Sequence, residues 1–196
     1  MRELSFPGRS NVLGQNGMAA TSNPLSSLEA INILKKGGNA IDAAIAASAV
    51  QAVVNPSATG VGGDCFAIVS INGKDPVSVN GSGIAPKKAK LEYYKTNKIN
   101  NIGLTSPHSV TIPGSVHAWC SMHEKFGNIE LEEVLLGAIN FARNGFPIHE
   151  VEALAWKENE NKLKANENSK NLFLKNNKSY GYGEVFKNYQ LAKTLQ

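Results

Sequence analysis

Cysteine is scarce in this sequence, because the 196 residues include only Cys65 and Cys120. The two lie far apart in apolar surroundings, without a C-x-x-C spacing or a histidine at ligand distance, so they do not indicate zinc. We expect two buried free thiols. His117 and His123 are six positions apart, whereas two ligands on one helix face are separated by about three or four. We therefore expect no metal site.

A long apolar run is also lacking. The most apolar stretch, residues 40–54, contains Asp42 and Gln51 and is shorter than the ~20 residues that cross a bilayer. The N-terminal MRELSFPGRS has no apolar core of a secretory signal. These features predict no membrane contact and a cytoplasmic location.

Clusters of arginine and aromatic platforms are absent, although the net charge is +4. Residues 1–86 hold five basic and five acidic side chains, so the excess lies in residues 87–196. There it consists mostly of Lys interleaved with Glu and Asn, and the run from Asn159 to Lys178 is typical of a solvated surface. This pattern does not favour nucleic-acid binding.

The residues that are present predict an α+β protein of one domain. Asn72-Gly73 between two β-prone runs, residues 65–71 and 76–80, predicts a hairpin. Cap residues, helical spacing and Gly or Pro stops predict helices, and shorter patterns predict two small strands. The expected helices cover residues 24–36, 39–55, 115–126, 130–143, 149–165 and 188–196. The two small strands are expected at 18–22 and 109–111. We expect a short helix and a loop within 87–103 and an exposed connection over 166–182.

Several polar residues have an ordinary explanation in these elements. Asp42 suits a helix start, His149 another, and Asp64 the ordering of the loop Gly60–Asp64. That loop precedes a strand rather than a helix, so it is better explained as a tight turn than as a phosphate cradle.

Separated motifs then follow one another in a fixed order. They are Gly8-Arg9-Ser10, residues 17–22, residues 37–44, residues 59–66, Ile112-Pro113-Gly114-Ser115, residues 138–147 and residues 191–195. In this order, along almost the whole chain, they resemble the γ-glutamyltransferase family.

The resemblance implies part of an N-terminal-nucleophile hydrolase, an αββα sandwich built from a proenzyme that cuts itself into two subunits. Residues 1–196 would form a single partial domain at the front of the large subunit. The family's nucleophile is a threonine in a Thr-Thr-His type junction that uses its own α-amine as base. No such tripeptide occurs here, so we expect no catalytic residue in this chain, no activity from it alone and no cofactor.

One position departs from the family pattern. Where γ-glutamyl transferases have arginine in an Arg-x-x-Ala-Pro run, this chain has Ser82-Gly83-Ile84-Ala85-Pro86. The guanidinium suits a substrate carboxylate, and a hydroxyl does not replace its charge. The residues Asn80 to Gly83, with Ala118-Trp119 after the Pro-Gly turn, resemble the branch of acylases and oxamate amidohydrolase-like proteins. Ser82 and, with less support, Asn80 are the expected substrate-binding residues.

The function that follows is hydrolysis or transfer at an amide bond, of a γ-glutamyl group as in glutathione breakdown or of a small acyl group. The expected partners are a small amide substrate and the C-terminal, small-subunit half of the same proenzyme. The chain ends within an expected helix, which suggests a longer protein. The alternative is a naturally short, non-catalytic homologue that serves as a binding or structural protein.

Overall fold

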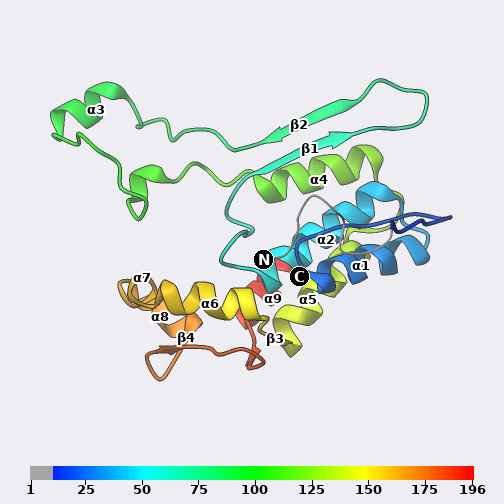
Figure 1. The fold of residues 1–196 in the computed structure, drawn as a ribbon. Helices are drawn as coiled ribbons and strands as arrows, with labels where there is room; N and C mark the ends of the chain where they lie inside the picture. The colour runs from blue at the N-terminus through cyan, green and yellow to red at the C-terminus, as the bar shows by residue number, and fades with distance from the viewer. Residues whose placement is uncertain (1–10) are drawn as a thin grey trace.

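A computed structural model describes residues 11–196 (Figure 1). The motif Gly8-Arg9-Ser10 and the expected leader-free N-terminus lie outside the described residues. The helices are α1 (Pro24–Lys35), α2 (Ala40–Val54), α3 (Leu91–Thr96), a 3-10 turn (Pro107–Ser109), α4 (Ser115–Phe126), α5 (Leu131–Asn144), α6 (Glu150–Glu158), α7 (Glu160–Lys164), α8 (Glu167–Phe173) and α9 (Tyr189–Leu195). The strands are β1 (Cys65–Val69), β2 (Val77–Gly81), β3 (Phe146–Pro147), β4 (Leu174–Lys175), β5 (Lys178–Ser179) and β6 (Val185–Phe186).

The core is helical and is centred on α2. α1 and α5 pack along α2, and α9 packs on α5. Ile45, Val50 and Val54 of α2 are fully or almost fully buried, and each contributes roughly 1.5–3 kcal/mol by burial. The predicted start of α2 is confirmed, because Asn39 and Asp42 form a reciprocal capping box.

α1 and α5 meet at a glycine. Gly137, in the middle of α5, lies against the carboxyl group of Glu29 from α1, which occupies the space where a side chain at 137 would begin. Glu29 is 9% exposed and accepts a hydrogen bond from Asn32 Nδ2 at 3.1 Å.

The predicted hairpin is confirmed. β1 pairs antiparallel with β2, from Cys65 opposite Gly81 to Val69 opposite Val77. The hairpin packs on α4, and Figure 1 shows it as a layer above the helices. Alternate residues on β1 face away from the helices, so Phe66 and Ile68 are 68% and 78% exposed.

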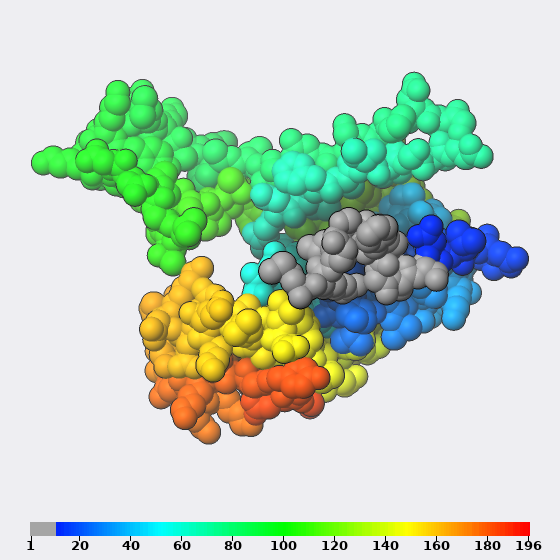
Figure 2. Space-filling view, viewed as in Figure 1, coloured from blue at the N-terminus to red at the C-terminus, as the bar shows by residue number. Residues whose placement is uncertain are grey.

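Residues 84–113 leave the hairpin as an extended arm that carries α3 and the 3-10 turn (Figures 1 and 2). Figure 2 shows that the arm projects away from the helical core. Its own packing is small and consists of Tyr93, Tyr94 and His108, whose rings meet at 5.5–5.8 Å. The short helix predicted in this region is present, but the strand predicted at 109–111 is wrong, because Ser109 belongs to a turn in which Ser106 Oγ accepts from His108 N–H at 3.2 Å.

The C-terminal lobe, residues 145–196, differs most from the prediction. The helix expected over 149–165 ends at Glu158 and a second one, α7, follows Asn159. The connection expected over 166–182 contains α8 and the hairpin β4–β5, whose turn residues Asn176 and Asn177 have φ of 54° and 63°. Trp156 organises this lobe, because Phe173, Tyr180 and Phe186 all pack against its ring.

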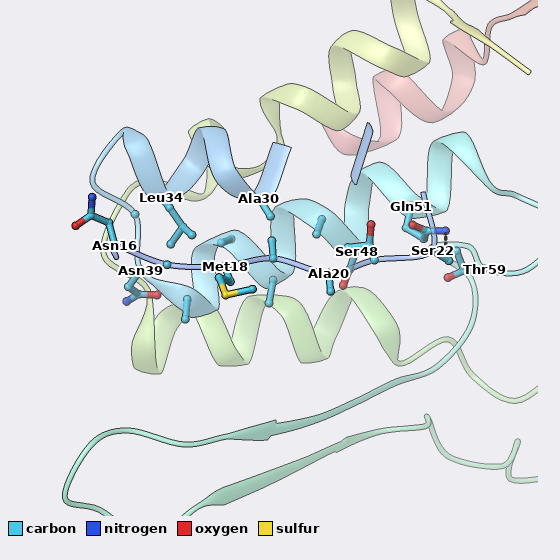
Figure 3. Close-up of a pocket in the computed structure, with 18 residues that line it drawn as sticks. Asn16, Met18, Ala20, Ser22, Ala30, Leu34, Asn39, Ser48, Gln51 and Thr59 are labelled. Atoms are coloured by element: carbon cyan, nitrogen blue, oxygen red, sulfur yellow. Dashed lines mark hydrogen bonds between the residues drawn. The ribbon is translucent and has the colours of Figure 1, made fainter. Parts of the chain in front are cut away.

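The strand predicted at 18–22 is also wrong. The segment has no strand assignment, and no described neighbour pairs with its backbone. The segment runs instead as an extended chain along α2 (Figure 3). Among residues 11–196, no helix is both long and apolar enough to cross a membrane.

Candidate functional site

Three glycines bring the hairpin and the start of α4 into close backbone contact. A Cβ on Gly81 would come within 2.5 Å of Ala118 Cβ, and one on Gly114 within 2.6 Å of Gly83 N. Gly83 has a φ of 71°, and its missing Cβ would overlap the carbonyl oxygen of Ile112. Only glycine fits such an approach, so this glycine crossing fixes the chain on both sides of Ser82.

Ser82 lies between two of these glycines, directly after β2, and is half-buried. Its backbone N–H donates to Asn80 Oδ1 at 3.0 Å, and its carbonyl accepts from Thr111 Oγ1 at 3.2 Å. The backbone of Ser82 is therefore held from two sides, while no residue among 11–196 hydrogen-bonds to its hydroxyl. The two residues expected at the substrate site lie together, with Asn80 exposed and its amide oxygen occupied by Ser82.

The glycine loop, residues 57–64, ends at the same crossing. The carbonyl of Gly63 accepts the backbone N–H groups of Gly114 and Ser115, at 3.2 and 3.0 Å. These two groups stand at the start of α4, where backbone donors have no partner within the helix. The loop is thus ordered by backbone contacts, and Asp64, to which sequence reasoning gave that role, is exposed.

Asp42 behaves as predicted at a helix start and also does more. Its carboxylate is fully buried and accepts from Asn39 N–H at 2.8 Å and from Asn128 N–H at 3.0 Å. His123 lies 3.9 Å from this carboxylate and contacts the carbonyl of Ile129 at 2.7 Å. His149 caps α6, as predicted, by accepting from Glu152 N–H through Nδ1.

The cysteines differ from expectation. Both are free thiols, but Cys120 is exposed and Cys65 is only partly buried. Burial raises the pKa of the Cys65 thiol, and a hydrogen bond with Trp119 offsets part of that rise. Within residues 11–196, no three His, Cys, Asp or Glu side chains gather into a group that could hold a metal ion.

Two grooves flank α2. The larger, of about 710 Å³, lies between α2 and the extended segment from Asn16 to Ser22 (Figure 3). Gln51 spans it at one end, where its Nε2 donates to Ser22 Oγ at 2.7 Å. The smaller groove, of about 430 Å³, lies between α2 and β1. Both grooves are lined by the same exposed, small residues of α2, Ala40, Ala44 and Ser48.

The family follows from a direct comparison. A family model described as gamma-glutamyltranspeptidase matches residues 26–196. The chain belongs to the gamma-glutamyltranspeptidase family. Its α+β fold is part of the αββα sandwich of N-terminal-nucleophile hydrolases, as the resemblance implied.

Individual members of the gamma-glutamyltranspeptidase family agree with this assignment. The chain is 35% identical over 187 residues to the glutathione hydrolase-like YwrD proenzyme of Bacillus subtilis, covering 94% of this chain and 35% of that protein. A cephalosporin acylase from Bacillus halodurans matches with a TM-score of 0.90 and 34% identity, over 98% of this chain and 37% of the other. The Helicobacter pylori gamma-glutamyltranspeptidase matches with a TM-score of 0.86 and 32% identity, over 95% and 54%. The chain thus spans about a third of the length of the curated relatives it matches.

Sequence reasoning predicted Ser82 and Asn80 as substrate-binding residues, which stays a prediction, and it did not predict what holds them. The three glycines of the crossing were visible in Gly81-Ser82-Gly83 and Pro113-Gly114, yet their mutual contact is set by tertiary structure. Glu152 was missed as well. It is fully buried and bonds to Ser57, 95 residues away, and no local pattern indicates such a partner.

Proposed function

We propose that this chain supplies the N-terminal part of an amide hydrolase or acyltransferase, which acts on a γ-glutamyl or small acyl amide. The observation that carries the proposal is the fixed backbone of Ser82 at the glycine crossing, with a hydroxyl to which no described residue bonds. Ser82 contributes to the pocket for the acyl group, and Asn80 orients it.

Ser82 changes the substrate that this pocket prefers. An arginine at this position would offer a charged, bidentate fork to a substrate carboxylate, whereas a hydroxyl offers one neutral hydrogen bond. We therefore expect amides of small or uncharged acyl groups to be favoured over γ-glutamyl amides. The structural likeness to a cephalosporin acylase supports this choice.

The nucleophile of the proposed reaction is a threonine in the remainder of the protein. Thr59 lines the large groove at the glycine loop, and Thr111 donates its hydroxyl to Ser82. Neither is an N-terminal residue with a free α-amine, and Thr105 lies in the arm. The chain alone is inactive under this proposal, and the reaction needs neither metal nor organic cofactor.

The proposed partner is the C-terminal half of the same proenzyme. Support comes from the apolar outer face of β1, where Phe66 and Ile68 are exposed, and from the grooves on both sides of α2. A β1 edge without a described neighbour on one side offers backbone groups to a further strand. The relatives named proenzymes are consistent with such a half. The cytoplasmic location stays a prediction.

Steady-state kinetics of the protein expressed with the reading frame that follows Gln196 tests the substrate proposal. Hydrolysis of small acyl amides should exceed that of γ-glutamyl anilides, and Ser82→Arg should shift the ratio of kcat/KM towards the γ-glutamyl substrate. Ser78→Arg, on the strand β2 that precedes Ser82, is the matched control for the added charge. Efficient γ-glutamyl turnover that Ser82→Arg leaves unchanged would refute it. A stop codon directly after Gln196 would instead favour the short, non-catalytic homologue.

A further inference from the structure

Glu152 carries, like Asp42, a carboxylate that is fully buried and bonded to a distant part of the chain. Glu152, in the first turn of α6, is 0% exposed. Its Oε1 accepts from Ser57 N–H at 2.9 Å and from Trp156 Nε1–H at 2.5 Å, and its Oε2 accepts from Ser57 Oγ–H at 2.6 Å. All three donors are neutral, so the carboxylate is satisfied by hydrogen bonds.

Ser57 lies where α2 ends and the glycine loop begins. It directly follows the Asn55-Pro56 turn that ends α2, and it is the first residue of the glycine loop. The far end of the loop is held where Gly63 accepts from Gly114 and Ser115. Glu152 therefore holds one end of the loop, and the glycine crossing beside Ser82 holds the other.

An ordinary helix-start acid does not account for these contacts. An acidic residue in the first turn is stabilising while exposed, but burying a carboxylate is costly unless hydrogen bonds satisfy it. Apolar residues of similar volume often serve equally well where only packing matters. The backbone of Glu152 is itself fixed, because its N–H donates to His149 at the α6 cap. The hydrogen bonds of Glu152 thus fix the position and orientation of Ser57, which packing of the lobe alone would not require.

We propose that Glu152 is a positioning residue through which the C-terminal lobe sets the path of the glycine loop, and so the surroundings of Ser82. Its relevance to catalysis rests on the proposed function, but its action on the loop does not. The contact between α6 and the loop crosses from the C-terminal lobe to the end of α2. Displacement of α6 would accordingly change the position of Ser57 and of the loop that it begins.

Three variants separate this role from plain packing. Glu152→Leu removes all three hydrogen bonds and keeps most of the volume. Glu152→Gln keeps the Oε1 acceptor, and its amide group donates to Ser57 Oγ, so this variant should restore the contact. Ser57→Ala removes only the hydroxyl bond and leaves α6 untouched.

The readouts are amide hydrogen exchange of residues 57–64 and the rate at which a disulfide reagent modifies Cys65, in a Cys120→Ser background. Cys65 reports on the loop because it is the next residue and is partly buried. In Glu152→Leu we expect exchange in the loop to be at least about tenfold faster, the effect of losing a net hydrogen bond, and Cys65 modification to be several-fold faster. Exchange in α2 should be unchanged, and Glu152→Gln should return both rates to within about twofold of the unmodified chain. Ser57→Ala combined with Glu152→Leu should be no faster than Glu152→Leu alone.

Neither readout requires catalysis, so loss of the proposed function would leave this test intact. The proposal is overturned if Glu152→Leu accelerates exchange in α6 but not in the loop, or if Glu152→Gln behaves like Glu152→Leu. If Glu152→Leu does not fold, Ser57→Ala decides: faster exchange of residues 57–64 supports the proposal, and unchanged exchange overturns it.

Discussion

The carboxylate of Asp42 accepts the backbone N–H of Asn128, so the start of α2 is joined to the loop that follows α4. The same carboxylate caps its own helix through Asn39. Removing it leaves the partly buried N–H groups of Asn39 and Asn128 without their acceptor and ends the cap, which together cost about 2–4 kcal/mol. Asp42→Ala should lower the free energy of unfolding by that amount in urea titrations. Asp75→Ala, at the exposed hairpin turn, is the control and should change it by less than about 0.5 kcal/mol. Equal effects at the two positions would contradict this account.

Gly83 lies in the glycine crossing, and Gly73 is its matched control outside the crossing. Both have φ in the left-handed region, at 71° and 76°, but a Cβ at 73 meets no atom within 4 Å, whereas one at 83 overlaps Ile112. Both substitutions to alanine carry a backbone cost of about 1–2 kcal/mol. Gly83→Ala should cost roughly a further 1–3 kcal/mol from the overlap. The difference between the two unfolding free energies measures the crossing, and a difference near zero would show that the backbones separate freely.

Glu160 should titrate far below an ordinary glutamate. Lys164 and the backbone N–H of Ser179 lower its pKa from 4.5 to about 2. Because the pKa is lower in the folded state, the stabilisation is complete above about pH 4.5 and is lost as the pH falls towards 2. Carboxyl-carbon NMR titration should give a midpoint near 2 for Glu160, rising in Lys164→Gln. If Lys164→Gln left this midpoint unchanged, Lys164 would not be the main cause of the lowered pKa of Glu160.

The arm should be the first part of the chain that proteases cleave. Its outer part, residues 87–108, is mostly exposed and has its aromatic packing among Tyr93, Tyr94 and His108, and segments with few buried contacts open most easily. It also carries five lysines, Lys87, Lys88, Lys90, Lys95 and Lys98. Brief trypsin treatment followed by mass spectrometry should place the first cuts there. Earlier cleavage after Lys35 or Lys36, at the end of α1, would contradict this order.

The outer face of β1 should cause self-association of the isolated 196-residue chain. Phe66 and Ile68 are exposed side by side on a strand without charged residues. Sedimentation should show concentration-dependent association that Phe66→Lys with Ile68→Lys reduces. Ser70→Lys with Ser78→Lys adds the same charge at exposed polar positions and should reduce it less. A monomer at all concentrations would refute the expectation.

Local signals account for the parts of the fold that were predicted from sequence. Asn72-Gly73 specifies its hairpin, and Asn39 with Asp42 specifies the start of α2, because each signal acts within a few residues. Cys120 was misjudged since its neighbours Ala118 and Trp119 turn inward on α4 while Cys120 points outward.

The C-terminal lobe was mispredicted for the opposite reason. Asn176 and Asn177 form a tight turn between Phe173 and Tyr180, and both of these rings pack on Trp156. The Lys- and Asn-rich composition, typical of an exposed loop, concealed this pairing. Ser82 could be proposed from the sequence because it departs from a family motif. The contacts of Gly114 with Gly83 and of Glu152 with Ser57 join distant residues, and no local pattern connects them.

The contact of Glu29 with Gly137 limits where motion can arise. The Glu29 carboxyl group fills the space that a side chain at 137 would occupy. A shift of α1 along α5 would therefore bring this group against the side chains that flank Gly137. α1 and α5 also both pack along α2, so we expect the three helices to move together. We therefore expect conformational change in the hairpin, the glycine loop and the arm rather than within these helices.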